Sequence, residues 1–323
     1  MQEIYSVLIL VIELGMNKKT VTILSVLVIL AFIVYMIIDF VKPAASVSDE
    51  SIIQQGQKTD DAWKISSEFK VNEGDLKTVS VTPSGKVYLG GDSFVSCYDN
   101  SMKLIWNIKA PSPITSISNW GDTIFASTSE QVLVMNANGK ILNEWGPFED
   151  SCMITSVSSN ENYVAFADAG NKIVYILDKG GEVKTMIGQN DKHFVIPSPY
   201  FEVALDNNNN LYAANTGLHR IETYTIDGVL KSQFGEAGTA PGAFCGCCAP
   251  PHFALIPQGF VTAEKGINRL KILNKNGEFV EFVNSKNNFI KSVPLDLASA
   301  DGVTIYAAYP GDSKLYVFNR KTP

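Results

Sequence analysis

The sequence has few of the residues that usually bind metals or carry acid–base chemistry, with 5 cysteines and 3 histidines among 323 residues. It also has no run of lysines and arginines, and its formal net charge is -7. Binding to nucleic acid requires basic groups that neutralise phosphates, so a nucleic-acid partner is excluded. The G-x-S-x-G, P-loop, H-E-x-x-H and Rossmann patterns are all missing from the sequence. We therefore expect a binding protein rather than an enzyme.

A helix-length apolar stripe is missing from everything after residue 61. That part of the chain instead contains short runs rich in Val, Ile, Tyr and Phe, separated by turns with Asn, Asp and Gly. Such runs are typical of β-strands. The composition is 46% hydrophobic, which is enough to form a large core. We therefore predict an all-β domain over residues 62–323.

One long uncharged run does occur, close to the amino terminus. Residues 20–41 include "VTILSVLVILAFIVYMIIDF", which carries no charge before Asp39. About twenty residues at a rise of ~1.5 Å match the ~30 Å hydrocarbon core of a bilayer. The alternative is a cleavable signal peptide, but its apolar region would be only ~7–15 residues long. We therefore predict an uncleaved transmembrane anchor over residues 20–41.

The charges around this run predict its orientation. Lys18 and Lys19 precede the run, whereas Asp39 and Lys42 nearly cancel at its other end. By the positive-inside rule, the preceding residues stay in the cytoplasm and the following domain lies outside. The sequence thus predicts a single-pass protein of the plasma (inner) membrane with an extracytoplasmic, periplasmic domain.

The segments on either side of the predicted anchor differ in character. Residues 1–19 form the cytoplasmic end, and Met16 opens the stretch "MNKKT", a typical start for an export signal. We expect translation to begin at Met16. Residues 42–61 are mostly polar and lack apolar periodicity, which is typical of a flexible stalk.

The β domain contains an internal repeat. Its clearest copies are "LYAANTGLHRIETYTIDGVLKSQF" from Leu211 and "FVTAEKGINRLKILNKNGEFVEF" from Phe260. Six such units fit between Trp63 and Phe318, each preceded by an apolar entry strand. A period of about forty residues with four strands per unit is typical of propeller blades, which bury their faces against one another. We predict a six-bladed β-propeller with four-stranded blades.

The last unit stops one strand short, at "LYVFNRKTP". The segment "AWKISSEFKV" from Ala62 precedes the first entry strand and resembles the exit strands of other units. Pairing it with the last unit would close the ring and remove two exposed sheet edges. We predict this closure.

The segments "NLYAANTGLHRIETYTIDG" and "GFVTAEKGINRLKILNKNGEF" resemble NHL repeats. The resemblance implies a six-bladed propeller, and the family includes scaffolds, ligand-binding receptors and a few enzymes. Arg220 and Arg269 match its basic position, whereas Asn215 and Glu264 stand where the family usually has Asp. The chain resembles in particular a membrane-anchored bacterial type with a "CGCC" loop.

In a propeller, the loops from the fourth strand to the next blade and from the second strand to the third share one face. That geometry brings several polar residues to one rim. The predicted ligand-binding residues of this rim are His193, His219, Arg220, Glu264, Lys265 and Arg269. Glu264 and Lys265 could act as a general base and a cation, but adjacent opposite charges on a loop are more often solvated, and we expect that here.

The stretch "FCGCCAPPHF" lies on the same rim. Its potential metal or disulfide residues, together with one cysteine from another inter-blade loop, are Cys245, Cys247, Cys248, His252 and Cys152. Thiolates and imidazole suit Cu, Zn or an iron–sulfur centre. A structural disulfide is favoured in an exported protein, and a free reactive thiol is the third interpretation.

Two functions remain open from the sequence. The first is a membrane-anchored binding or scaffold module whose rim recognises a protein, peptide or small ligand. The alternative is a metal-binding or redox and electron-transfer protein that uses the Cys/His cluster. Hydrolase or lyase activity has only the precedent of the fold.

Overall fold

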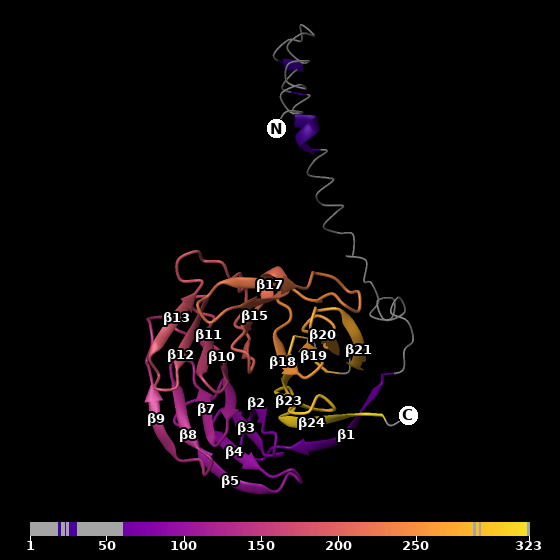
Figure 1. Cartoon of the computed structure of the whole chain (residues 1–323). Coiled ribbons are helices and arrows are strands. Elements are labelled where there is room, and N and C mark those ends of the chain that lie inside the picture. Colours follow the sequence, from indigo (N-terminus) through magenta and orange to yellow (C-terminus); the bar gives the residue numbers. More distant parts are fainter. Residues whose placement is uncertain are drawn as a thin grey trace. The chain divides into compact units, whose positions relative to one another are not determined.

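The computed structural model describes residues 19–20, 23, 26–30, 61–286, 289–290 and 292–321. The chain divides into two compact units, Met1–Gln57 and Lys58–Pro323. In the second unit the strands form six four-stranded antiparallel sheets arranged in a ring (Figure 1). The predicted six-bladed propeller with four-stranded blades is confirmed.

The blades are numbered here in chain order from the first complete one. Blade 1 contains β2 (Leu76–Val81), β3 (Val87–Gly91), β4 (Phe94–Tyr98) and β5 (Leu104–Lys109). Blade 2 contains β6 (Ser116–Trp120), β7 (Thr123–Ser127), β8 (Val132–Asn136) and β9 (Ile141–Trp145). Blade 3 contains β10 (Ile154–Ser159), β11 (Tyr163–Asp168), β12 (Ile173–Asp178) and β13 (Val183–Ile187).

The remaining blades follow the same plan. Blade 4 contains β14 (Val203–Leu205), β15 (Leu211–Asn215), β16 (Arg220–Tyr224) and β17 (Leu230–Phe234), with the short 3-10 helix η1 (Thr216–Leu218) between β15 and β16. Blade 5 contains β18 (His252–Ile256), β19 (Gly259–Ala263), β20 (Leu270–Asn274) and β21 (Phe279–Asn284). Blade 6 contains β22 (Asp296–Ala298), β23 (Thr304–Tyr309), β24 (Lys314–Arg320) and β1 (Trp63–Lys70).

The Asn/Asp-Gly turns seen in the sequence join the third and fourth strands of several blades. In blade 3, Asp178 accepts hydrogen bonds from the backbone N–H groups of Gly180 and Glu182, at 2.9 and 3.0 Å. Gly181 adopts φ 90°, a left-handed conformation that glycine tolerates without strain. The side-chain bonds and this glycine together fix a tight hairpin that a β-branched residue could not form.

The hydrophobic core is divided among the interfaces between blades. One cluster, for example, joins Tyr88 and Val95 of blade 1 to Ile117, Ile124 and Leu133 of blade 2. Cys97 is fully buried in the same cluster, as expected for a small apolar side chain. Five further clusters lie between the other pairs of neighbouring blades. Each blade therefore depends on both of its neighbours for burial of its apolar faces.

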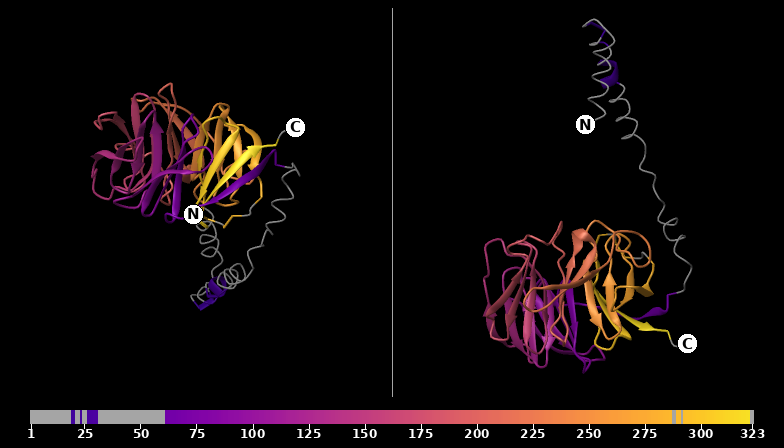
Figure 2. Two further views of the ribbon diagram at one scale, coloured as in Figure 1. Left: turned by 90° about the horizontal axis from the view of Figure 1, so that it is seen from below. Right: turned by 45° about the horizontal axis from the view of Figure 1, so that its top comes forward.

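Strand β1 closes the ring by pairing with β24, from Trp63 opposite Arg320 to Lys70 opposite Lys314. Figure 2 shows the indigo strand of β1 lying beside the yellow strand of β24 in both views. The indole N–H of Trp63 also donates to Glu281 of blade 5, at 2.9 Å. The prediction that the segment from Ala62 completes the last blade is confirmed.

The described residues of the first unit, 19–20, 23 and 26–30, are helical. Ile23 and residues 26–30 of this helix expose 50–63% of their surface. Among the described residues, no helix has the length and apolar character that crossing a membrane requires. Most of the predicted anchor at 20–41, the stalk at 42–61 and Met16 lie outside the described residues.

The closure by β1 predicts a sharp difference between two shortened chains. A chain that begins at Asp61 keeps β1 and should unfold in one cooperative transition. A chain that begins at Asn72 lacks β1, so it exposes the edge of β24 and the apolar surface that Trp63 covers. We expect it to aggregate or to unfold without cooperativity. Circular dichroism melts and size-exclusion chromatography check this, and equal melting of the two chains would contradict the closure.

Candidate functional site at the top of the channel

The top face is defined here as the end of the propeller that carries the loops between blades and the loops from second to third strands. Three of these connections are long, at residues 188–202, 235–251 and 285–295. Turns at the opposite end are short, such as residues 257–258 between β18 and β19. Loops held on a rigid scaffold commonly carry binding residues. The top face is therefore the first place to look for a site.

Six side chains occupy equivalent places around the top of the central channel, one from each innermost strand or the residue just before it. They are Thr78, Ser116, Ser156, Glu202, His252 and Asp296. Several of them accept a hydrogen bond from a backbone N–H of the next blade: Ile117 donates to Thr78 at 3.2 Å, Val157 to Ser116 at 3.1 Å, Val203 to Ser156 at 3.2 Å and Val79 to Asp296 at 2.9 Å. We call these six residues the channel ring.

Three neighbouring members of the channel ring are charged or titratable. Nδ1 of His252 lies 2.7 Å from Oε2 of Glu202 and 3.7 Å from Oδ1 of Asp296. Glu202 is 8% exposed, so these groups lie in a largely dehydrated place. Among the described residues, these three form the one group of His, Cys, Asp or Glu side chains with atoms close enough to hold a metal ion.

Burial and hydrogen bonding compete in setting the protonation of this group. Burial alone would lower the pKa of His252, but the hydrogen bond and charge of Glu202 outweigh it and raise the pKa above its ordinary value. Burial also raises the pKa of Glu202. The pKa values of both groups are thus raised, and Nδ1 of His252 and Oε2 of Glu202 lie within hydrogen-bonding distance at 2.7 Å. The arrangement can hold a cation or exchange a proton with a ligand in the channel.

A cavity of about 200 Å³ lies at the channel ring. Innermost-strand residues of all six blades line it, including Ser116, Glu202 and Asp296. The carboxylates therefore face a space that a small ligand or water can enter.

The cysteine loop lies on the same face, in the connection between β17 and β18. Gly266 donates its backbone N–H to the carbonyl of Cys245 at 3.1 Å, and a Cβ on Gly246 would come within 2.9 Å of Gly266 N. His219 donates from Nε2 to the carbonyl of Gly246 at 2.5 Å. Glycine at both positions lets the two loops touch, which holds the cysteines against the loop of blade 5.

The thiols of this loop are free but unequally placed. Sγ of Cys247 lies 3.3 Å from Sγ of Cys248, Cys247 is exposed and Cys248 is buried. Burial raises the pKa values of Cys248 and Cys245. His252 points to Glu202 and Asp296 in the channel, so the structure separates its imidazole contacts from the pair of thiols.

Cys152, the other candidate from an inter-blade loop, belongs to a different part of the rim. It packs in the core cluster between blades 2 and 3, and burial raises its pKa to about 12, with Asp168 adding to the effect. All five cysteines are free in this structure. Of the predicted cysteines, Cys247 and Cys248 are the ones brought into contact.

In blade 4, the predicted rim residues surround a buried carboxylate. Glu222 is fully buried and accepts from Nε of Arg220 at 2.5 Å, from the Tyr224 hydroxyl at 2.5 Å and from Asn215 at 3.0 Å. Nε2 of His193 lies 2.8 Å from the same carboxylate. His193 and Arg220 thus hold the loops of blade 4 together around Glu222.

Blade 5 has a similar cluster, and here the expectation of a solvated charge is wrong. Glu264 is fully buried and bonds to Nε of Arg269 at 2.6 Å and to Nζ of Lys271 at 3.0 Å. Its other oxygen accepts the backbone N–H of Cys245 at 2.7 Å. The buried partners Arg269 and Lys271 neutralise the carboxylate, which is why it can leave water. Arg269 further donates to the carbonyls of residues 239, 240 and 243 and so fixes the cysteine loop.

Lys265, unlike its neighbour Glu264, is partly exposed. Its ammonium lies 4.5 Å from the centre of the Tyr200 ring, a cation–π contact. Tyr200 in turn packs edge-on against His252, with ring centres 5.9 Å apart. Lys265 and Tyr200 thus connect the loop of blade 5 to the channel ring.

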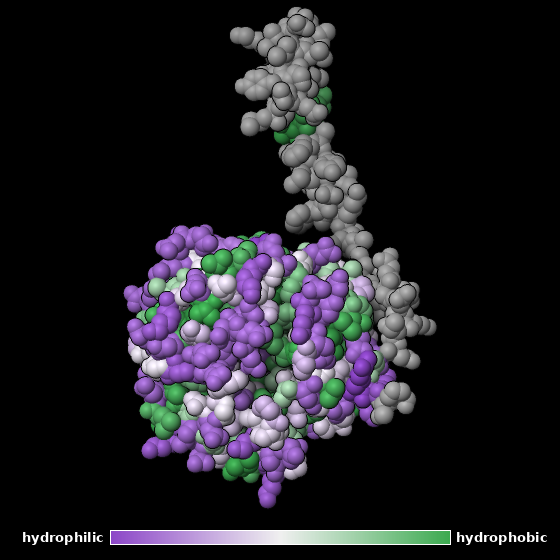
Figure 3. Space-filling view, viewed as in Figure 1, coloured by the Kyte–Doolittle hydropathy of each residue, from purple (hydrophilic) through white to green (hydrophobic). Residues whose placement is uncertain are grey.

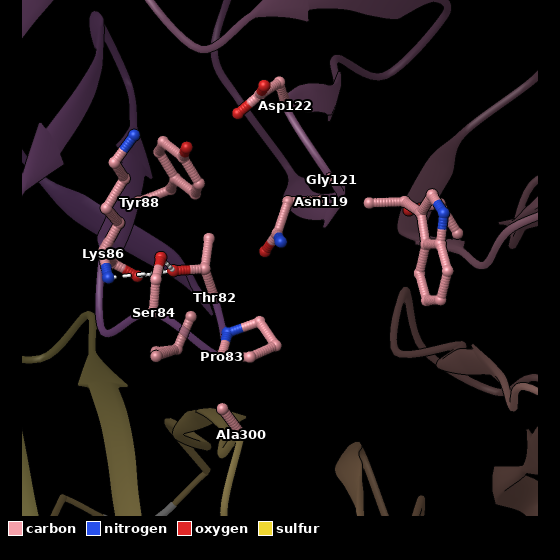
Figure 4. A pocket seen from close by; sticks show the side chains of 12 residues that line it. Thr82, Pro83, Ser84, Lys86, Tyr88, Asn119, Gly121, Asp122 and Ala300 are labelled. Atoms are coloured by element: carbon pink, nitrogen blue, oxygen red, sulfur yellow. Dashed lines mark hydrogen bonds between the residues drawn. The ribbon is translucent and has the colours of Figure 1, made fainter.

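A cavity of about 650 Å³ opens at the other end of the propeller. Turn residues of blades 1 and 2 line it, among them Thr82, Ser84, Lys86 and Asp122, and Figure 4 shows Lys86 and Tyr88 on one side with Asp122 across from them. Its lining contains none of the predicted cysteines or histidines. Its titratable lining residues are Lys86, Tyr88 and Asp122, and they do not repeat the arrangement of a histidine between two carboxylates that the top face carries.

Sequence reasoning missed Glu202, Asp296 and the buried partners Glu222 and Lys271. A signal for two of them was present, because the entry strands "FEVAL", "HFALI" and "LDLA" each carry a titratable residue at the same register. Aligning the six entry strands position by position would have revealed the three charged members of the channel ring.

The buried Lys271 predicts an alkaline change in stability. Burial lowers its pKa from 10.5 to about 8, whereas the unfolded chain keeps the proton up to about 10.5. The buried charge on Lys271 therefore destabilises the folded protein below pH 8. This destabilisation decreases as the pH rises above 8, because the folded protein releases the proton before the unfolded chain does. Relative to Lys271→Met, the unfolding free energy of the parent protein should rise by about 2 kcal/mol from pH 7 to 10. Urea unfolding measures this, and the exposed Lys275→Met is the control. Parallel curves for parent and Lys271→Met would contradict the buried charge.

No family model matches the chain, and no curated protein matches it. Solved structures do resemble it. A streptogramin B lyase structure aligns with a TM-score of 0.56 and 12% identity, covering 80% of this chain and 98% of that one. The WD40 β-propeller domain of Doa1 aligns with the same TM-score, identity and coverage. At this identity the likeness shows the fold alone: the chain is a β-propeller.

Proposed function

We propose that this protein is a membrane-anchored binding module whose propeller lies outside the cytoplasm and takes a protein or peptide on its top face. The observation that carries the proposal is the concentration of long loops on that face, at residues 188–202, 235–251 and 285–295. The opposite end has short turns. Long loops on a rigid β scaffold are where binding surfaces are usually built.

Exposed apolar side chains on these and neighbouring top loops support a polypeptide ligand. Met153, Val195, Leu218 and Ile290 expose 44%, 42%, 41% and 62% of their surface. Val195 and Leu218 belong to adjoining segments, since Gly217 donates its N–H to the carbonyl of Val195 at 2.8 Å. On the face seen in Figure 3, hydrophobic side chains are interspersed with hydrophilic ones. Mixed surfaces of this kind are typical of non-obligate protein interfaces.

The anchor and orientation belong to the same proposal. The described helical residues near the amino terminus include Ile23, Leu27 and Ile29, each more than half exposed. An apolar helix face exposed to this degree suits a hydrocarbon environment. The preceding Lys18 and Lys19 favour a cytoplasmic amino terminus.

The resemblance to NHL repeats fits this role. Arg220 and Arg269, at the basic position of the repeat, hold top-face loops through Glu222 and Glu264. A repeat whose basic residue fixes loops on one face gives that face a defined shape for a ligand. We propose that the chain belongs near the membrane-anchored, NHL-like propellers of bacteria.

A photo-crosslinking amino acid tests both surface and orientation. Benzoylphenylalanine at Leu218, on the top face, should give a discrete crosslinked product in living cells because the ligand covers this loop. The same residue at Val229, in the opposite turn of blade 4 and 62% exposed, is the matched control and should give none. Protease added to intact spheroplasts should digest the product. Equal crosslinking at both positions, or a protected product, would contradict the proposal.

A second function is favoured by the thiol pair. Cys247 and Cys248 have sulfur atoms 3.3 Å apart with one of them exposed, so a reagent can reach the pair. We propose that these residues form a redox-active dithiol, which loses two electrons and two protons to a disulfide-bearing or azo oxidant as the S–S bond forms.

Diamide, an azo oxidant, tests the dithiol. Treatment of the native protein should reduce the thiols titratable after denaturation from five to three, because one disulfide forms within the loop. The variants Cys247→Ser and Cys248→Ser should each keep all four of their remaining thiols. Cys97→Ser, at a buried site, is the control and should still lose two. Loss of thiols in Cys247→Ser would contradict the assignment.

A further inference from the structure

Half of the channel ring shows which kind of side chain is sufficient to join neighbouring blades. At the junctions from blade 1 to blade 2, blade 2 to blade 3 and blade 3 to blade 4, the residues that bridge to the next blade are Thr78, Ser116 and Ser156, all neutral hydroxyls. Hydroxyls are therefore sufficient to join neighbouring innermost strands. The acidic Glu202 and Asp296 and the titratable His252, at the next three places, are not needed for that purpose.

Placing charges in a buried ring is unfavourable. Removing a carboxylate from water costs several kcal/mol unless it gains a partner of opposite charge. Glu202 is 8% exposed and lies on the ring beside a second acidic position, Asp296, with only His252 between them. A bound cation would compensate both carboxylates at once.

The outer contacts of the two carboxylates leave one oxygen of each directed at His252. The hydroxyl of Ser156 donates to Oε1 of Glu202, so Oε2 is the oxygen that faces Nδ1 of His252. The backbone N–H of Val79 donates to Oδ2 of Asp296 at 2.9 Å, and Oδ1, which accepts the backbone N–H of Leu297 at 2.9 Å, is the oxygen nearest that same nitrogen. Outer hydrogen bonds of this kind orient the ligands of metal sites.

We propose that Glu202 Oε2, His252 Nδ1 and Asp296 Oδ1 bind a divalent first-row transition-metal ion at the top of the channel. The three atoms lie within 4.8 Å of one another. Tetrahedral coordination at ~2.1 Å separates ligand atoms by ~3.4 Å, which lies between the observed 2.7 and 3.7 Å.

The ligand set selects the kind of ion. One imidazole nitrogen with two carboxylate oxygens suits Zn²⁺ or a neighbouring transition metal, whereas Ca²⁺ and Mg²⁺ prefer oxygen alone. Three protein ligands leave a fourth position for water or a ligand group. Glu202 and Asp296 line the cavity of about 200 Å³, from which a ligand group would reach that position. The site does not depend on the polypeptide ligand proposed above.

The test uses the full-length chain, with Cys247→Ser and Cys248→Ser in every sample so that this pair of thiols cannot hold the metal. Isothermal titration with Zn²⁺ after chelation, and metal analysis after dialysis against Zn²⁺, should each give one ion per chain. Asp296→Asn and Glu202→Gln keep an oxygen for Val79 and Ser156, so folding is preserved. Each should weaken Zn²⁺ binding at least tenfold, and His252→Gln should do the same.

The matched control is His193→Gln. His193 also pairs with a buried glutamate, Glu222, at 2.8 Å on the same face, but with no second carboxylate in the pair. This variant should bind Zn²⁺ like the parent. The proposal is overturned if the parent binds no Zn²⁺, if Asp296→Asn and His252→Gln bind it like the parent, or if Mg²⁺ and Ca²⁺ bind as tightly. If Glu202→Gln does not fold, Asp296→Asn decides.

Discussion

The pairing of β1 with β24 is the contact on which the rest of the molecule depends. Each blade buries its faces against its two neighbours, so each interface between blades supports the next one around the ring. Because the strands that meet at the closure lie at opposite ends of the domain, it joins distant parts of the chain. A closed ring then fixes the angular position of every innermost strand, and thereby the spacing of the side chains around the channel.

Closure of the ring brings together charged side chains that belong to different blades. Glu202, His252 and Asp296 come from three successive blades, and their separations are set by the ring rather than by local structure. The buried carboxylates Glu222 and Glu264 act differently, because each is neutralised mainly by residues of its own blade. The carboxylates of Glu202 and Asp296 line a cavity, whereas Glu222 and Glu264 hold the loops of blades 4 and 5 in place. Burial alone thus does not separate a binding group from a structural one.

The top face combines these two arrangements. Arg269 and Glu264 fix the loop that carries Cys247 and Cys248, and Tyr200 links Lys265 of the neighbouring loop to His252. A ligand bound to the long loops would therefore lie close to Lys265 and Tyr200, which connect these loops to His252 of the channel ring. The thiols and the channel ring share a face but have separate partners, so they can serve separate chemistry.

The class of fold, the number of blades and the strand that closes the ring can all be predicted from the sequence. Alternating apolar strands, Asn/Asp-Gly turns and a repeat of fixed length are local signals, and a missing last strand has one obvious donor. The contacts between polar residues, in contrast, depend on how the blades are arranged in space. His252 was grouped with the cysteines through nearness in sequence, yet its side chain lies with Glu202 and Asp296, 50 and 44 residues away. Glu264 was expected in water because it adjoins Lys265, and its burial depends on Arg269 and Lys271. Contacts across blades are set by closure of the ring, which no local pattern encodes.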